Sequence, residues 1–243
     1  MYQFLIDRFI PMTTQFTYPP EKYRSESAQS SRFWNLWLPV IAFFLVLFIA
    51  WFDKAFFAAW LNNEETGLLE FIHFFFPLLT ALIGLRLMFT PLVRSDWFLM
   101  MWCSLIFLGG IYLAGEEASW GQHYLEWATP ENWRTVNDQQ ETNLHNVSNL
   151  LDQLPRAILL VGIFVTCIIY PWILIKKPNL LPRRFDFTYP PLALQPLAWL
   201  IFAASLYRLI RKTNLFNEFL NYRPGEFQEL FIVWLLLYYA LFL

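Results

Sequence analysis

Apolar residues in this chain come in long blocks, and the length of the blocks limits the folds that it can adopt. Each block has about the length, roughly 20 residues, of an α-helix that crosses the hydrocarbon core of a membrane. The blocks lack the periodic spacing of apolar positions that is typical of helices in a soluble domain. The sequence therefore predicts an all-α fold, an integral membrane bundle of helices in contact with lipid.

The composition agrees with this class of protein. Hydrophobic residues make up 57% of the chain and charged residues 15%, whereas about a quarter of the residues of a soluble domain are charged. No basic patch with interleaved aromatic residues indicates a nucleic-acid partner. Cys103 and Cys167 both lie inside apolar blocks, and their spacing supports neither a disulfide nor a metal site.

Six blocks are long enough to be membrane spans, and they are residues 33–52, 67–89, 97–114, 155–175, 192–210 and 226–243. Residues 1–32 are more polar and form a cytoplasmic or interfacial segment, so residues 33–243 are expected to form one polytopic domain. A polar segment, residues 115–154, separates spans three and four. The start signal Thr129-Pro130-Glu131 predicts one short interfacial helix there, and an apolar stripe over residues 140–154 predicts a second.

Basic residues set the expected orientation. In a six-span topology one side of the membrane carries Lys22, Arg24, Arg32, Arg86, Arg94, Lys176, Lys177, Arg183 and Arg184. Basic loops face the cytoplasm, so both termini are expected there and the polar segment is expected outside. Arg208, Arg211 and Lys212 would end span five on the outer side. Either span five is re-entrant or these cations pair with outer carboxylates, and we favour the pairing.

Carboxylates cluster at the outer ends of the spans. Ionisable groups at membrane depth are costly, so they are candidates for a functional site. Glu116 and Glu117 end span three, and Glu141 follows in the polar segment together with His145. A helix over residues 140–154 would place Glu141, His145 and Asp152 on one face.

The histidines are candidate metal ligands, and a polar role at the membrane interface is the alternative for His73 and for His123. Glu70 and His73 are three residues apart on span two, which is the spacing of carboxylate–imidazole sites inside helical bundles. Mixed Glu and His ligation suits zinc, iron or manganese. Another histidine, His123, is seven residues after Glu116 and would lie on the same helical face if span three continues beyond Gly115.

These patterns give three sets of candidate residues. The candidate catalytic carboxylates are Glu116, Glu117 and Glu141, and the candidate metal ligands are Glu70, Glu117 and His145. Structural or phosphate-binding roles are expected for Arg208, Arg211, Gln122, Asn143 and Asn146. In the alternative interpretation, the group Glu116, Glu117, Glu141 and His145 is a hydrogen-bonded plug that fixes the outer helices and performs no chemistry.

Three motifs together resemble a signature of an uncharacterised family of bacterial multi-pass membrane proteins. They are Gly115-Glu116-Glu117-x-Ser119-Trp120-Gly121-Gln122, Thr129-Pro130-Glu131 and Gln140-Glu141-Thr142-Asn143-Leu144-His145-Asn146. Glu70 and the acidic start of the last span, Glu226 and Glu229, fit the same pattern. The sequence departs from it at His123, where the family pattern has arginine. The resemblance implies a bacterial inner-membrane location and the position of a site, but no activity.

Two functions follow from the sequence. The first is a membrane enzyme, in which a divalent metal activates water or polarises a lipid or lipid-linked substrate. The second is a non-catalytic accessory or assembly subunit of a larger membrane complex, which the aromatic content of 20% favours because aromatic side chains offer surface for packing. An ion path is less favoured, since spans three, four and six carry no charged residue at mid-depth.

Overall fold

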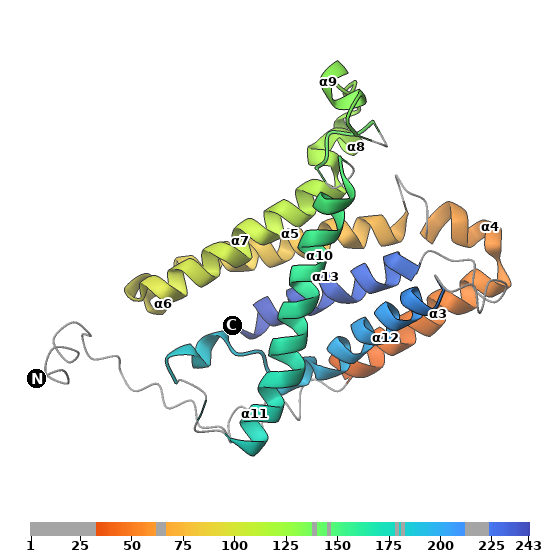
Figure 1. Ribbon diagram of the computed structural model, residues 1–243. Helices are drawn as coiled ribbons and strands as arrows, with labels where there is room; N and C mark the ends of the chain where they lie inside the picture. The colour runs from red at the N-terminus through yellow and green to blue at the C-terminus, as the bar shows by residue number, and fades with distance from the viewer. Residues whose placement is uncertain are drawn as a thin grey trace, which may run out of the picture.

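A computed structural model describes residues 33–61, 67–137, 140–144, 147–177, 180, 183–211 and 224–243. Every regular element in these ranges is helical, which confirms the predicted all-α class (Figure 1). The predictions for residues 1–32, His145, Asn146 and Lys212 fall outside the described residues. The same holds for the side chains of His123, Asp152 and Arg211.

Five helical segments are long and apolar enough to cross a membrane, and they are Leu68–Met88, Trp97–Glu117, Gln153–Ile173, Leu192–Ile210 and Gly225–Phe242. They correspond to predicted spans two to six. The first predicted span contains a π-helical turn, η1 (Phe33–Trp37), and α3 (Leu38–Phe52), which has 15 residues. At the α-helical rise of about 1.5 Å per residue, α3 is shorter than the five longer segments.

Helices α5 (Leu68–Met88) and α7 (Trp97–Glu117) lie side by side, joined by the short helix α6 (Pro91–Ser95) (Figure 1). Glycine allows the close approach. A Cβ atom added at Gly110 would lie 2.6 Å from the carbonyl oxygen of Pro77, and one added at Gly84 would lie 2.9 Å from the nitrogen of Phe107. Small residues at helix crossings bring backbones together in membrane bundles, so α5 and α7 form one closely packed unit.

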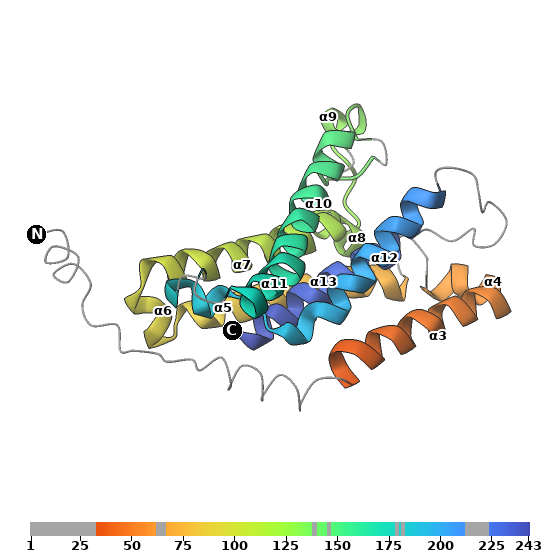
Figure 2. The same cartoon turned by 60° about the horizontal axis from the view of Figure 1, so that its bottom comes forward.

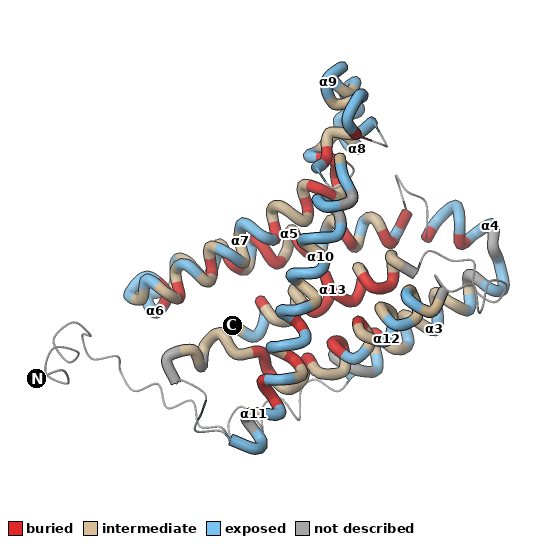
Figure 3. The backbone as a smooth tube through the Cα atoms, in the orientation of Figure 1, coloured by how far each residue is buried: buried red, intermediate tan, exposed pale blue. Residues whose placement is uncertain are grey.

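Helix α13 (Pro224–Phe242) packs against both α5 and α12 (Gln195–Arg211). It carries much of the core, including the buried Phe231, which packs with Leu197 and Ile201 of α12. Figure 3 shows buried positions along α13 and exposed positions on the outward sides of the surrounding helices. Large apolar side chains such as Leu108 and Val161 are exposed there, as expected for helices that contact lipid.

Three consecutive elements, α10 (Asn149–Phe164), η4 (Val165–Ile169) and α11 (Tyr170–Lys176), form a rod that crosses the other helices (Figures 1 and 2). Ile163 and Cys167 of this rod contribute to the core around α13. The first turn of α10 lies at the same end of the molecule as the last turn of α7 (Figure 1). The remaining short elements are α4 (Lys54–Phe56), η2 (Phe57–Leu61), η6 (Arg183–Thr188) and η7 (Leu192–Leu194).

The connection between α7 and α10 differs in part from the prediction. It contains η3 (Ser119–Gly121), α8 (Gln122–Leu125) and α9 (Glu131–Arg134), and α9 begins at the predicted start signal. The predicted helix over residues 140–154 is wrong in its first half, because residues 140–144 are bent and α10 begins only at Asn149. Ser148 caps α10 by accepting a hydrogen bond from the Leu151 amide at 3.2 Å. Glu141 and Asp152 therefore do not share a helical face.

Candidate functional site

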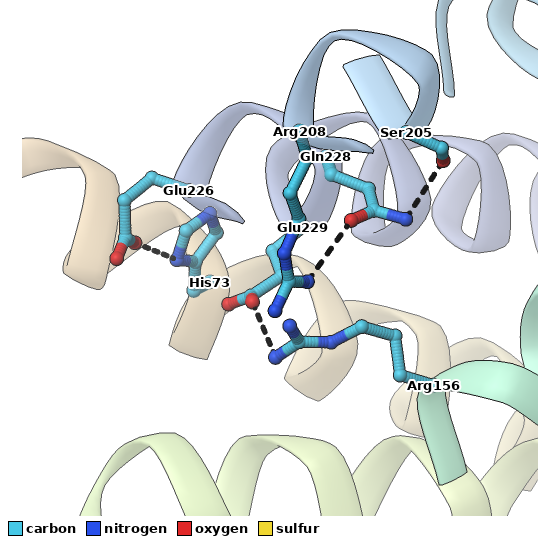
Figure 4. Close-up of polar contacts among 7 residues, drawn as sticks. All are labelled: His73, Arg156, Ser205, Arg208, Glu226, Gln228 and Glu229. Atoms are coloured by element: carbon cyan, nitrogen blue, oxygen red, sulfur yellow. Dashed lines mark hydrogen bonds and ion pairs between the residues drawn. The ribbon is translucent and has the colours of Figure 1, made fainter. Parts of the chain in front are cut away.

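One end of the bundle collects charged side chains from four helices. Helices α5, α10 and α13 begin there and α7 ends there, so residues far apart in sequence meet. We call this set the polar cluster, and it consists of Glu70 and His73 of α5, Glu117 of α7, Arg156 of α10, and Glu226 and Glu229 of α13. Figure 4 shows four members of the cluster, and they are His73, Arg156, Glu226 and Glu229.

His73 is the most buried member of the cluster, with 1% of its surface exposed. Its Nδ1 atom lies 3.6 Å from Oε2 of Glu226 (Figure 4). Neither ring nitrogen has a hydrogen-bond partner among the described residues. Buried polar atoms are nearly always hydrogen-bonded, since burying them without a partner is unfavourable. The buried imidazole beside a carboxylate makes His73 a candidate ligand residue.

The spacing of the cluster suits a metal ion. Two overlapping groups share His73, and in each group the candidate ligand atoms lie within 4.8 Å of one another: Glu70, His73 and Glu117 form one, and His73, Glu226 and Glu229 form the other. Ligands on a tetrahedral ion with bonds of about 2.0–2.2 Å are separated by roughly 3.4 Å. The separation of 3.6 Å between His73 and Glu226 is long for a hydrogen bond and close to that value.

Arg156 supplies a positive charge to the cluster. Its guanidinium lies 2.5 Å from Oε1 of Glu229, and both side chains are partly exposed (Figure 4). Sequence reasoning missed this residue because Arg156 falls at the start of an apolar block, directly after Pro155. Its position could have identified it, because in the predicted topology Arg156 lies at the same membrane face as Glu117.

Arg208 lies beside the cluster on α12. Its Nη1 group donates a hydrogen bond to Oε1 of Gln228 at 3.3 Å, and Gln228 Nε2 donates to Oγ of Ser205 at 2.8 Å (Figure 4). Gln228 is adjacent to Glu229 in α13. The structure thus places Arg208 at the predicted end of the bundle, where it contacts α13. Its proposed phosphate-binding role stays a prediction.

The second group of polar residues links the end of α7 to Asn137 and residues 140–144, and we call it the clasp. It consists of Glu116, Ser119, Trp120, Gln122, Asn137, Glu141, Thr142 and Asn143. Glu116 is buried and accepts two hydrogen bonds, from Nε1 of Trp120 and from the Leu144 amide, each at 2.7 Å. Its carboxylate therefore joins the two ends of the clasp.

Ser119 and Asn143 form the centre of the clasp, and both are buried. The Ser119 hydroxyl donates to Oε2 of Glu141 at 2.8 Å, and Asn143 Nδ2 donates to the same oxygen at 2.6 Å. Asn143 in turn accepts from Nδ2 of Asn137 at 2.9 Å. A buried polar network with this many partners is rigid.

Side chains also explain why residues 140–144 are not helical. The amides of Glu141 and Thr142 donate to Oδ1 of Asn137 at 3.0 Å and to Oε1 of Gln122 at 2.8 Å. The Leu144 amide donates to Oε2 of Glu116. Amide, hydroxyl and carboxylate side chains that bind nearby backbone groups compete with helix formation, which the apolar stripe alone does not reveal.

The turn after α7 has an uncommon backbone. Ser119, Trp120 and Gly121 have φ values of 45°, 57° and 104°, and the left-handed region costs about 1–3 kcal/mol for a residue other than glycine. The hydrogen bonds of the clasp offset this cost. The Trp120 ring also packs on Gly115, where an added Cβ would lie 2.9 Å from the ring.

The predicted site residues therefore divide into two groups. Glu70 and Glu117 come together with His73, and Glu116 and Glu141 belong to the clasp. Gln122 and Asn143 are clasp residues as well. The predicted third ligand, His145, lies outside the described residues, as does Asn146. Catalytic roles for Glu116, Glu117 and Glu141 stay predictions.

Electrostatic interactions connect the two groups. Glu70 is acted on by the charges of Glu226 and Glu229 in the polar cluster and by that of Glu141 in the clasp. Glu117 is acted on by the charges of the three other carboxylates of the cluster and by that of Arg156. The clasp and the cluster are thus neighbours at the end of α7.

No protein family, curated protein or solved structure matches this chain.

Proposed function

We propose that this protein is a metal-dependent membrane enzyme whose divalent ion is bound by His73 together with Glu70 and Glu117, with Glu226 and Glu229 as the second carboxylate pair beside the same imidazole. The observation that carries the proposal is the buried imidazole of His73, which has no hydrogen-bond partner among the described residues and lies 3.6 Å from a carboxylate oxygen. One imidazole among carboxylates suits zinc, iron or manganese. Magnesium and calcium prefer oxygen ligands alone.

The charge of the polar cluster supports a cation. Four carboxylates, those of Glu70, Glu117, Glu226 and Glu229, lie around the imidazole of His73, and Glu229 also pairs with the guanidinium of Arg156. Carboxylates held close together away from water repel one another strongly, and burying them is unfavourable unless they are paired. A divalent ion between Glu70 and Glu117 reduces this repulsion.

The position of the cluster supports catalysis at a membrane surface. It lies at the ends of apolar helices long enough to cross a membrane, where a lipid or lipid-linked substrate meets polar groups. A metal ion there polarises a substrate oxygen or activates water. Glu229 lies close to His73 and pairs with Arg156, and we propose it as the group that exchanges a proton with the substrate or water.

We also propose that the cluster faces the outer side of a bacterial inner membrane, with both termini in the cytoplasm. The charge distribution supports this. Arg86, Arg94 and Lys176 lie toward the far ends of α5, α6 and α11, away from the cluster. Loops rich in lysine and arginine remain on the cytoplasmic side.

Metal analysis tests the proposed function. The protein, purified in lipid nanodiscs and equilibrated with Zn²⁺ or Mn²⁺, is expected to retain the ion after desalting, and His73→Ala is expected to lose it. Glu131→Gln is the matched control, because Glu131 is an exposed carboxylate of α9, away from the cluster. Retention by His73→Ala equal to that of the wild-type chain would contradict the proposal, and so would an absence of retained metal in the wild-type chain.

A further inference from the structure

Glu116 and Glu117 are neighbours in sequence, but their side chains have different surroundings. Glu116 is buried in the clasp, where two hydrogen bonds of 2.7 Å hold its carboxylate. Glu117 belongs to the polar cluster with Glu70 and His73. Consecutive residues of an α-helix point about 100° apart. Fixing Glu116 on one side of the last turn of α7 therefore fixes the direction in which Glu117 projects.

We infer that the clasp is a positioning device for Glu117, and that clasp residues control metal affinity without touching the metal. The inference rests on the proposed metal site. Helix ends fray readily, because their last carbonyl groups lack intrahelical partners. Glu117 is the last residue of α7, so its carboxylate needs external support to remain opposite His73.

The clasp provides that support through hydrogen bonds between the turn after α7 and the later segment that returns to it. Directly after α7, the hydroxyl of Ser119 donates to Glu141 and the backbone carbonyl of Ser119 accepts from the Thr142 hydroxyl at 2.7 Å. On the returning segment, Asn143 donates to the Ser119 hydroxyl at 3.0 Å. The turn at Ser119 is thus held by three residues that arrive more than twenty positions later.

The central side chains of the clasp are buried, whereas the side chains of an ordinary surface loop are exposed to solvent. Ser119 and Asn143 are 0% and 1% exposed, and Glu116 is 4% exposed. Residues behind a metal ligand orient it, and substituting such residues commonly weakens metal affinity by about 10–100-fold. Glu116 and Glu141 are therefore positioning residues, which differs from the catalytic role that their sequence pattern indicates.

Two variants test the inference through Zn²⁺ affinity. Trp120→Phe removes the Nε1 donor to Glu116 and keeps an aromatic ring, and Asn143→Ala removes the centre of the clasp. Each is expected to weaken Zn²⁺ binding about 10–100-fold. Thr135→Ala is the control, because its exposed hydroxyl donates to the nearby carbonyl of Asn132 in the same connection. The affinity of this variant is expected to match that of the wild-type chain.

A double-mutant cycle separates positioning from a general loss of structure. In a Glu117→Gln background, Trp120→Phe is expected to cause no further loss of affinity. In a Glu226→Gln background, which leaves Glu117 in place, the full loss is expected. Equal losses in both backgrounds would overturn the inference, as would a Trp120→Phe affinity equal to that of Thr135→Ala. If Asn143→Ala does not fold, the milder Trp120→Phe decides the result.

The outcomes also separate this inference from the proposed function. If the wild-type protein binds no Zn²⁺ and no Mn²⁺, the metal site and the positioning role both fail. If the wild-type protein binds Zn²⁺, and Glu117→Gln weakens binding while the clasp variants do not, the metal site stands and the positioning role alone fails.

Discussion

Nδ1 of His73 on α5 lies 3.6 Å from Oε2 of Glu226 on α13, at the end of the bundle where α7 also contributes Glu117. The two helices pack against each other, so their packing sets this separation. The imidazole is buried and has no hydrogen-bond partner among the described residues. The fold therefore holds a polar atom in a costly position, and the cation that we propose would remove that cost.

His73→Leu is expected to affect the metal-free and metal-bound proteins differently. Replacing an unsatisfied buried polar group by an apolar one is nearly neutral or stabilising, so the melting temperature without metal should stay the same or rise. The stabilisation by metal, about 2.7 kcal/mol at a concentration one hundred times Kd, should vanish. Thermal unfolding in detergent with and without Zn²⁺ measures both effects. A large loss of stability without metal would show that His73 has a structural role instead.

Arg156→Gln is expected to change stability and metal affinity in opposite directions. Removing the guanidinium leaves Glu229 without its partner at 2.5 Å, which should lower the free energy of unfolding without metal by about 1–3 kcal/mol. The excess of negative charge grows, so divalent ions should bind more tightly. Arg134→Gln, at an exposed arginine of α9, is the matched control. Weaker metal binding in Arg156→Gln would contradict this account of the charges.

Gly110→Ala is expected to disturb the cluster from within the bundle. The added Cβ would lie 2.6 Å from the Pro77 carbonyl oxygen, and overpacking of this kind costs about 1–3 kcal/mol. Separating α5 from α7 also moves Glu70 and His73 relative to Glu117, so metal affinity should fall. Gly109→Ala is the control, because an added Cβ there meets nothing within 4 Å. Equal behaviour of the two variants would argue against close packing at Gly110.

Metal affinity is expected to fall as the pH is lowered. The proposed ligands bind as carboxylates and as a neutral imidazole, so protons compete with the ion for the same atoms. Zn²⁺ titrations across a pH series in nanodiscs measure the effect, and retained metal in acid that matches the amount retained near neutrality would count against direct ligation by these groups.

The apolar blocks of the sequence were enough to predict most of the fold. Predicted spans 67–89 and 97–114 correspond to α5 and α7, because a long apolar run at membrane depth has no alternative to a helix. The prediction failed in part at residues 140–154. There an apolar stripe favoured a helix, but Glu116, Gln122 and Asn137 bind the backbone amides instead.

The site was predicted only in part, since its members come from different helices. Glu70 and Glu117 were identified from their positions at span ends, and the spacing of Glu70 and His73 indicated a metal site. The contribution of Arg156 depends on how the α10 rod crosses the bundle, which periodicity cannot show. Likewise, the sequence could not reveal that Glu116 and Glu117 have different surroundings, because that depends on where the returning segment lies.

X-ray absorption at the zinc edge of the loaded protein tests the central claim most directly. The account predicts a shell of nitrogen and oxygen ligands at about 2.0–2.2 Å with the scattering signature of imidazole. That signature should disappear in His73→Gln and persist in His123→Gln. A spectrum that His73→Gln leaves unchanged would contradict the account.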